Sequence, residues 1–309
     1  MSQETHTALL TPAARAKAIE DAFLEQYLIY FHKAEDNRRW RLNHDIPWDK
    51  ANPEVSDDVA TIVEGYYAVE SYLPDYVHTM MEMIRKSRGR AWFQANWGYE
   101  ESKHAMAWET WLVKSGKRTQ AQVNEYADFL SEKQWNLPYD TPRRMMVYQM
   151  VQERATYLNY HNLAARVEKH ENDPALSTAL RIVSKDEIAH HGFFYKGIQT
   201  YLQYEPAETL EDIAHILKSF SMPAQNFLYN WTEFEEVVAR AGIYGPREHV
   251  KDVQNPILNA LGYTNRRDLE RAALRLRIVP DNIGPRDIPD WAKEPEDRPA
   301  DAMVVYTGD

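Results

Sequence analysis

Two pairs of acidic and imidazole side chains occur in this 309-residue sequence with the same spacing. Glu101 is followed three positions later by His104, and Glu187 is followed in the same way by His190. Residues three apart on an α-helix project from the same side, so each pair forms one possible ligand unit. A carboxylate or imidazole that is buried without a partner is costly, so each pair must face water or bind something that compensates.

A single glutamate lies upstream of each pair, within a strong helical pattern. Glu70 precedes Glu101 by 31 positions, and Glu153 precedes Glu187 by 34. The chain therefore contains two similar halves, each a glutamate helix followed by a Glu-x-x-His helix. A four-helix bundle that binds two metal ions uses this set of side chains, all directed inward. The predicted metal ligands are Glu70, Glu101, His104, Glu153, Glu187 and His190.

The ligand types indicate which metal the site would hold. Four carboxylates and two neutral imidazoles carry a charge of about −4, which two divalent ions balance. Hard oxygen and imidazole nitrogen ligands suit iron or manganese, and the sequence does not distinguish the two. Other glutamates of these helices are expected to be surface charges, namely Glu64, Glu82, Glu100 and Glu168.

Long helices are needed to position these side chains, and the sequence predicts an all-α fold of amphipathic helices with short breaks. Pro74 is expected to bend one helix beside Glu70, because proline has no N–H to donate to that carbonyl. Gly116 is expected to end another helix in the left-handed conformation. The predicted helices span residues 13–33, 57–86 and 90–114, and two more begin at Thr141-Pro142 and Asp173-Pro174.

Composition narrows the possibilities further. The absence of cysteine excludes disulfides, thiolate zinc sites, Cys-ligated iron–sulfur clusters and a cysteine nucleophile. Apolar residues (44%) and charged residues (27%) are close to the globular average, which favours a single domain over residues 1–309 with a core over about 55–245. Five prolines from Pro280 onward predict an irregular tail over about residues 280–309 that wraps the surface or reaches a neighbouring subunit.

Charge and hydropathy bear on partners and location. A net charge of −11 gives no global support for binding nucleic acid or anionic membranes. No apolar stretch approaches the roughly 18 to 20 residues of a membrane span. The first residues carry no signal-peptide core, so we expect a cytoplasmic protein.

Several short motifs, in the same order along the chain, resemble those of the soluble acyl-acyl-carrier-protein desaturases, a ferritin-like di-iron family. That family carries "EENRH", "QERAT" and "DEKRH"; the corresponding segments here are "EESKH" from Glu100, "QERAT" from Gln152 and "DEIAH" from Asp186. The family's "EALP" resembles "ESYLP" at Glu70, which is one residue longer, and its "SMPA" matches from Ser221. The agreement extends over residues 70–244 and is loose outside them.

The resemblance implies a ferritin-like four-helix bundle in which the same six residues bind two iron ions, with O₂ as co-substrate. It also implies that Thr156 lines the oxygen side of the cluster, although its hydroxyl could instead bond its own helix backbone. Asp186 would orient a ligand histidine. Trp40 would be the surface end of an electron path or a packing residue. Departures between the ligands ("SK" and "IA"), with Trp97 and Tyr99 before the first motif, are expected to alter substrate geometry or outer hydrogen bonds.

The implied reaction is the O₂-dependent introduction of a cis double bond into an acyl chain on acyl carrier protein, an oxidoreductase activity of fatty acid metabolism and lipid biosynthesis. Because no cysteine or flavin motif is present, electrons would come from a ferredoxin-like donor, and a homodimer is expected. Two alternatives stay open. One is a di-iron oxygenase that hydroxylates a carrier-bound or free substrate in secondary metabolism; the other is an iron-storage protein, against which the long segment after the second motif argues.

The substrate would need a bent apolar groove, and the acidic carrier protein a local basic surface. Candidates for the groove, which are otherwise plain core residues, are Met106, Trp108, Met145, Met146, Tyr148 and Phe194. Candidates for docking, which are otherwise solvated basic faces, are "NRRWR" from Asn37, "RKSRGR" from Arg85 and "NRRDLERAALRLR" from Asn265.

Overall fold

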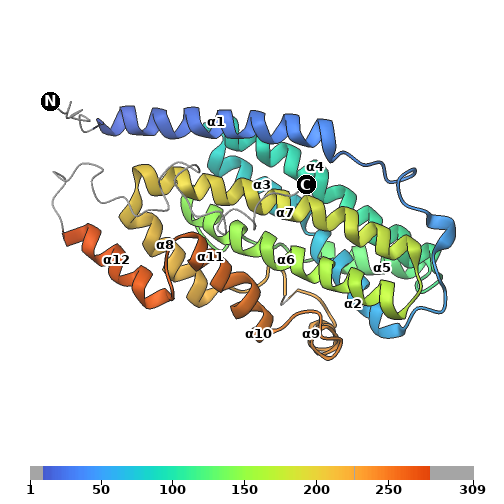
Figure 1. The fold of residues 1–309 in the computed structure, drawn as a ribbon. Helices are drawn as coiled ribbons and strands as arrows, with labels where there is room; N and C mark the ends of the chain where they lie inside the picture. Colours follow the sequence, from blue (N-terminus) through green and yellow to red (C-terminus); the bar gives the residue numbers. More distant parts are fainter. Residues whose placement is uncertain (1–9, 226, 279–309) are drawn as a thin grey trace.

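The computed structural model describes residues 10–225 and 227–278, and these residues form helices and connecting loops without a β-strand (Figure 1). The expected all-α fold is therefore confirmed. The elements are α1 (Pro12–Asn37), the 3₁₀ turn η1 (Trp48–Lys50), α2 (Asp57–Glu70), α3 (Leu73–Ile84), α4 (Arg88–Lys114), α5 (Gln120–Ser131), α6 (Pro142–His170), α7 (Pro174–Tyr204), α8 (Pro206–Ser219), α9 (Trp231–Arg240), α10 (Pro246–Glu248), the π-helical segment η2 (His249–Gln254), α11 (Asn255–Ala260) and α12 (Arg266–Ile278).

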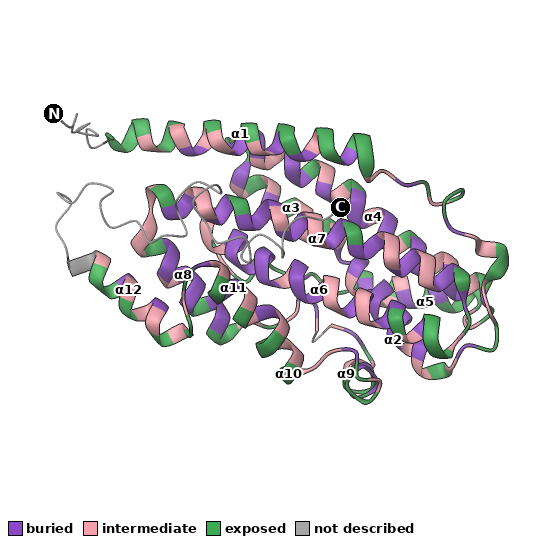
Figure 2. Cartoon of the chain, in the orientation of Figure 1, coloured by how far each residue is buried: buried purple, intermediate pink, exposed green. Residues whose placement is uncertain are grey.

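Four of these helices, α2, α4, α6 and α7, form a bundle. α6 and α7 are joined by a short turn and pack side by side along most of their length (Figure 1). α2 packs on α4, which also contacts α7, while α1 covers α4 and α7 from outside. Buried residues concentrate on the faces that these helices turn toward one another (Figure 2). The bundle interior is therefore the place where side chains of all four helices can meet.

Local signals in the sequence set the ends of these helices as expected. The hydroxyl oxygen of Thr141 accepts from the N–H of Arg144 at 3.3 Å, and a carboxylate oxygen of Asp173 accepts from the N–H of Leu176 at 2.8 Å. Each capping residue is followed by a proline in the first turn, where the missing N–H costs nothing. Gly116 has φ +72°, the left-handed conformation expected after α4.

The continuous helix expected over residues 57–86 is wrong, because the chain breaks after Glu70 and resumes as α3. Pro74 cannot donate to the carbonyl of Glu70, and the outcome is a break rather than a bend. The hydroxyl of Tyr76 donates to the carbonyl of Val69 at 2.9 Å, which satisfies a carbonyl near the end of α2. Glu70 is consequently the last residue of its helix.

Other expectations about the chain are only partly addressed by the described residues. α1 begins earlier and ends later than residues 13–33. The proline-rich tail over residues 280–309 lies outside the described residues, and the single domain over residues 1–309 stays a prediction. Across residues 10–225 and 227–278, every helix is too short or too polar to cross a membrane.

Candidate metal centre

The six side chains predicted as ligands meet inside the bundle, and each is at most 5% exposed. Their ligand atoms form two overlapping groups, within each of which the atoms lie within 4.8 Å of one another. One group is Glu70, Glu101, His104 and Glu187, and the other is Glu101, Glu153, Glu187 and His190. Glu101 and Glu187 belong to both groups, so their carboxylates can bridge two ions. Glu70 and Glu153 belong to one group each and would be terminal ligands.

Both imidazoles face the centre through Nδ1. The Nδ1 atom of His104 lies 3.2 Å from one oxygen of Glu101 and 3.2 Å from one oxygen of Glu187. The Nδ1 atom of His190 lies 3.0 Å from the other oxygen of Glu101 and 3.7 Å from the other oxygen of Glu187. Each shared carboxylate therefore turns one oxygen toward each histidine, so it would offer one oxygen to an ion held beside each imidazole.

Several buried atoms of this cluster lack a hydrogen-bond partner among the described residues. They are Oε1 of Glu101, Oε2 of Glu153, both carboxylate oxygens of Glu187 and Nδ1 of His190. Buried polar atoms are normally satisfied, and leaving them without partners is unfavourable. Two divalent cations would satisfy these atoms through carboxylate oxygen and imidazole nitrogen, which are ordinary ligands for iron and manganese. The residues present fit a pair of metal ions.

Crowding of like charges changes the protonation of the centre. Burial, together with the negative charges of Glu101 and Glu187, raises the pKa of Glu70 well above its ordinary value. Burial likewise raises the pKa of Glu153. Burial alone would lower the pKa of His104, but Glu101 and the other carboxylates around it raise that pKa well above its ordinary value. Metal binding at this centre would therefore displace protons.

An acidic residue supports each imidazole from the side opposite the centre. The Nε2 atom of His104 lies 3.2 Å from Oδ2 of Asp186, and the Nε2 atom of His190 lies 2.8 Å from Oε2 of Glu100. A carboxylate in this position fixes the orientation and tautomer of a ligand imidazole. The geometry matches the orienting role predicted for Asp186, which itself stays a prediction.

The expectation that Glu100 is a surface charge is wrong. Its side chain is 1% exposed, and it contacts His190 and the hydroxyl of Tyr30, which donates to Oε2 at 2.5 Å. Burial would raise the pKa of Glu100, but the hydrogen bond and charge of His190 lower it below its ordinary value. The sequence held a signal for this residue, because Glu100 directly precedes Glu101 just as Asp186 directly precedes Glu187.

Glu64 is the second glutamate for which a surface position was wrongly expected. It is 7% exposed, and the guanidinium of Arg118 binds its two oxygens at 2.5 and 2.9 Å. This two-point ion pair compensates the buried carboxylate without a metal. Glu82 and Glu168 are exposed, as expected.

Thr156 lies one turn after Glu153 on α6. Its hydroxyl donates to the backbone carbonyl of Gln152 at 3.0 Å. This bond to its own helix is the one expected if Thr156 has no role at the centre. A role of Thr156 on the oxygen side of the centre stays a prediction.

Trp40 is buried, and its Nε1 donates to Oδ2 of Asp186 at 2.7 Å, so a hydrogen-bonded connection runs from Trp40 through Asp186 to His104.

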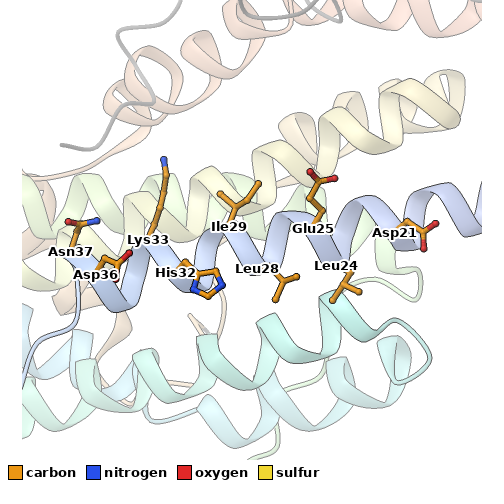
Figure 3. Close-up of a pocket in the computed structure, with 9 residues that line it drawn as sticks. All are labelled: Asp21, Leu24, Glu25, Leu28, Ile29, His32, Lys33, Asp36 and Asn37. Carbon is orange, nitrogen blue, oxygen red and sulfur yellow. The ribbon is translucent and has the colours of Figure 1, made fainter.

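Five of the six residues proposed for an acyl groove are buried in the hydrophobic core, and Met106 is exposed on α4. A surface pocket of about 580 Å³ lies on α1 instead (Figure 3). Leu24, Leu28 and Ile29 contribute its apolar part, and neither the six predicted ligands nor the proposed groove residues line it. The position of an acyl groove stays a prediction.

Comparisons with known proteins identify the family of the chain and agree with its fold. The sequence matches the family model of the fatty acid desaturases over residues 33–280. The chain belongs to this family. Among curated relatives, the chloroplastic stearoyl-[acyl-carrier-protein] 9-desaturase of Gossypium hirsutum is 25% identical over 220 residues, covering 65% of this chain and 54% of the relative. Stearoyl-[acyl-carrier-protein] 9-desaturase 1 of Arabidopsis thaliana is 26% identical over 223 residues, covering 65% and 55%. The matched region thus spans about half the length of these relatives.

A solved structure supports the architecture. DesA2 of Mycobacterium tuberculosis H37Rv, named as an acyl-ACP desaturase, matches with a TM-score of 0.60 and 20% sequence identity. The match covers 82% of this chain and 98% of that chain. At this identity the likeness concerns the fold, which is a ferritin-like helical bundle.

Proposed function

We propose that this protein is a di-iron, O₂-dependent desaturase that introduces a cis double bond into an acyl chain carried on acyl carrier protein. The observation that carries the proposal is the pair of overlapping Glu/His groups at the centre of a fatty acid desaturase bundle. The relatives that are named as stearoyl-[acyl-carrier-protein] desaturases support a carrier-bound acyl substrate, although they are only about one-quarter identical.

In this proposal the six buried Glu and His side chains hold two iron ions. The bound pair supplies the O₂-dependent oxidation of an unactivated methylene. The chain itself positions the ligands and excludes water, since no side chain of the six is more than 5% exposed. Two hydrogens leave adjacent carbons, and two electrons from an external donor, together with two protons from solvent, complete the reduction of O₂ to two water molecules.

A ferredoxin-like protein is the proposed electron donor. The hydrogen-bonded connection from Trp40 through Asp186 to His104 supports an entry route on the side where the loop after α1 packs. Both bonds involve groups that are at most 6% exposed, so the route lies inside the protein.

The acidic carrier protein needs a basic surface, and α12 is the strongest of the three candidates. Arg38 and Arg39 of the first segment point toward buried acids, and Arg90 of the second pairs with Glu20. On α12 the exposed residues Arg267, Arg271 and Arg275 are four positions apart and share one face, and Arg271 also lies 3.5 Å from Oδ1 of Asp268. Charge reversal by Arg271→Glu should raise KM for the carrier-bound substrate more than it lowers kcat, and an unchanged KM would exclude this surface.

Mass spectrometry of the acyl chain tests the proposed reaction. Iron-loaded protein is incubated with reductant, acyl-acyl carrier protein and ¹⁸O₂, and the Glu101→Ala variant is the control. Loss of two hydrogens without gain of oxygen supports desaturation. Incorporation of ¹⁸O into the product would overturn it in favour of hydroxylation.

A further inference from the structure

One guanidinium joins the two acids that support the ligand imidazoles. Arg38 directly follows α1 and is 14% exposed through its side chain. Its Nη1 contacts Oδ1 of Asp186, and its Nη2 lies 3.2 Å from Oε1 of Glu100. The same Nη2 donates to the hydroxyl oxygen of Tyr30 at 2.6 Å. Asp186 supports His104, so a single side chain touches both halves of the centre from outside.

The two acids need a cation for physical reasons. The side chains of Glu100 and Asp186 are 1% and 2% exposed, so both negative charges are buried, each beside a predicted ligand imidazole. Buried charges without compensation are strongly unfavourable. A guanidinium is planar and carries donors on separate nitrogens, so it can bind two carboxylates at once, whereas an ammonium is a point charge.

The neighbouring arginine offers a contrast. Arg39 contacts the same Oε1 of Glu100, and its other partners are Glu35 and Asn96. No contact between Arg39 and Asp186 is found among the described residues. Arg39 therefore touches only the half of the centre that contains His190.

The Glu-x-x-His helices supply one cation near the two acids, the buried Lys103, whose charge acts on Asp186 and Glu100 but which forms no ion pair with either among the described residues. The residues directly before the two ligand histidines are Lys103 and Ala189. Ala189 carries no charge, and the Nζ atom of Lys103 lies 4.0 Å from the ring centre of Trp40. The guanidinium contacts to the two buried acids thus come from the connector after α1, a segment outside the four-helix bundle.

We propose that Arg38 is a positioning residue that holds both ligand imidazoles in place by bridging Glu100 and Asp186. Arg39 assists one half only. The inference rests on the proposed function, because it takes the six buried side chains as metal ligands. It assigns a role to the "NRRWR" segment that is distinct from docking.

Cobalt binding to the metal-free, full-length protein tests the proposal. Co²⁺ occupies sites of oxygen and nitrogen ligands and reports coordination through visible absorption. Wild-type protein should bind two Co²⁺ ions per chain. Arg38→Ala should lower the affinity for both Co²⁺ ions by roughly 10-fold to 100-fold, the range found when a partner behind a metal ligand is removed. Arg39→Ala should lower the affinity for one Co²⁺ ion and leave the affinity for the other unchanged.

Two further variants separate positioning from general destabilisation. Arg38→Lys keeps the charge and most of the aliphatic stem, so it should fold, but it should not restore two tight sites. Arg118→Ala removes a partly buried arginine from a different carboxylate, Glu64, and should leave cobalt binding unchanged. Thermal unfolding of each metal-free variant is measured in parallel.

The outcomes distinguish this inference from the proposed function. Wild-type protein that binds no Co²⁺ would contradict the metal centre itself. The bridging role of Arg38 would be overturned if the wild-type protein binds two Co²⁺ ions tightly and Arg38→Lys binds both with the same affinity. Equal losses in Arg38→Ala and Arg118→Ala would also overturn it, because the effect would then be one of stability.

Discussion

The two halves of the metal centre use the same residue types, yet they hold their terminal carboxylates differently. Glu153 lies in the interior of α6 and accepts a hydrogen bond from Nε1 of Trp97 at 3.0 Å. Glu70 is the last residue of α2, next to the break before α3, and accepts from the hydroxyl of Tyr160. Helix ends open more easily than helix interiors. The half that contains Glu70 therefore has more freedom to rearrange.

The imidazoles, by contrast, are supported in a similar way in both halves. His104 is backed by Asp186, which Trp40 also contacts, and His190 is backed by Glu100. The halves thus differ at the terminal carboxylate rather than at the histidine. We infer that the His190 half binds its ion more tightly and that the Glu70 half adjusts around the second ion.

Removing a shared carboxylate should have the largest effect, because it damages both halves at once. In Glu101→Ala we expect less than one tightly bound iron per chain and no detectable desaturation. Iron per chain is measured by mass spectrometry of the metal, and product by mass spectrometry of the acyl chain. Glu82→Ala, at an exposed glutamate, is the matched control. Retention of two irons in Glu101→Ala would contradict the bridging assignment.

Removing a terminal carboxylate should affect one half and so reveal the asymmetry. Glu70→Ala should leave one tightly bound Co²⁺ ion per chain, in the half with His190. Glu153→Ala should leave only the more weakly bound Co²⁺ ion, in the half with Glu70. Its first binding constant should therefore lie further below the wild-type value than that of Glu70→Ala. Calorimetric titration of the metal-free variants measures both constants. Identical isotherms for the two variants would mean that the halves are equivalent.

The hydrogen bonds to the terminal carboxylates should contribute less. Tyr160→Phe removes only the hydroxyl that contacts Glu70, and we expect the corresponding ion to bind roughly 10-fold more weakly while the stoichiometry stays at two. Trp97→Phe removes the indole donor to Glu153 and should act on the other ion. Cobalt titration followed by visible absorption tests both. If Tyr160→Phe binds as the wild type does, its hydroxyl is not needed to orient Glu70.

The smallest effect concerns pH. Because the pKa values of Glu70, Glu153, His104 and His190 are raised, these four groups hold more protons in the folded metal-free protein than in the unfolded chain. Three histidines with lowered pKa values, His161, His191 and His249, hold fewer. The lowered histidines are mostly deprotonated in both states above about pH 7, so the free energy of unfolding of the metal-free protein should fall as pH rises from about 7 to about 8, where the folded state binds more protons.

Saturating Co²⁺ should reverse this pH trend, since the metal takes the place of the protons. Thermal unfolding at several pH values, with and without Co²⁺, measures both trends. A metal-free protein that becomes more stable over the same range would contradict the protonated state of the centre.

The sequence by itself predicted the ends of several bundle helices and proposed the six ligands that the structure brings together. The spacing of three residues places Glu101 with His104 whatever the surroundings, because helix geometry is local. The helix starts at Thr141-Pro142 and Asp173-Pro174, and the end at Gly116, are likewise local effects of capping, of a missing N–H and of a left-handed φ. These features could be predicted because each depends on a few neighbouring residues.

Only the tertiary structure decided which further charges are buried. Glu100 is next to Glu101 in sequence, but its burial depends on Tyr30 and Arg38, which arrive from α1 and the loop after it. The burial of Glu64 depends in the same way on Arg118, 54 positions away. A carboxylate is tolerated inside a protein only where a distant partner compensates it, and such partners are set by packing between helices rather than by local spacing.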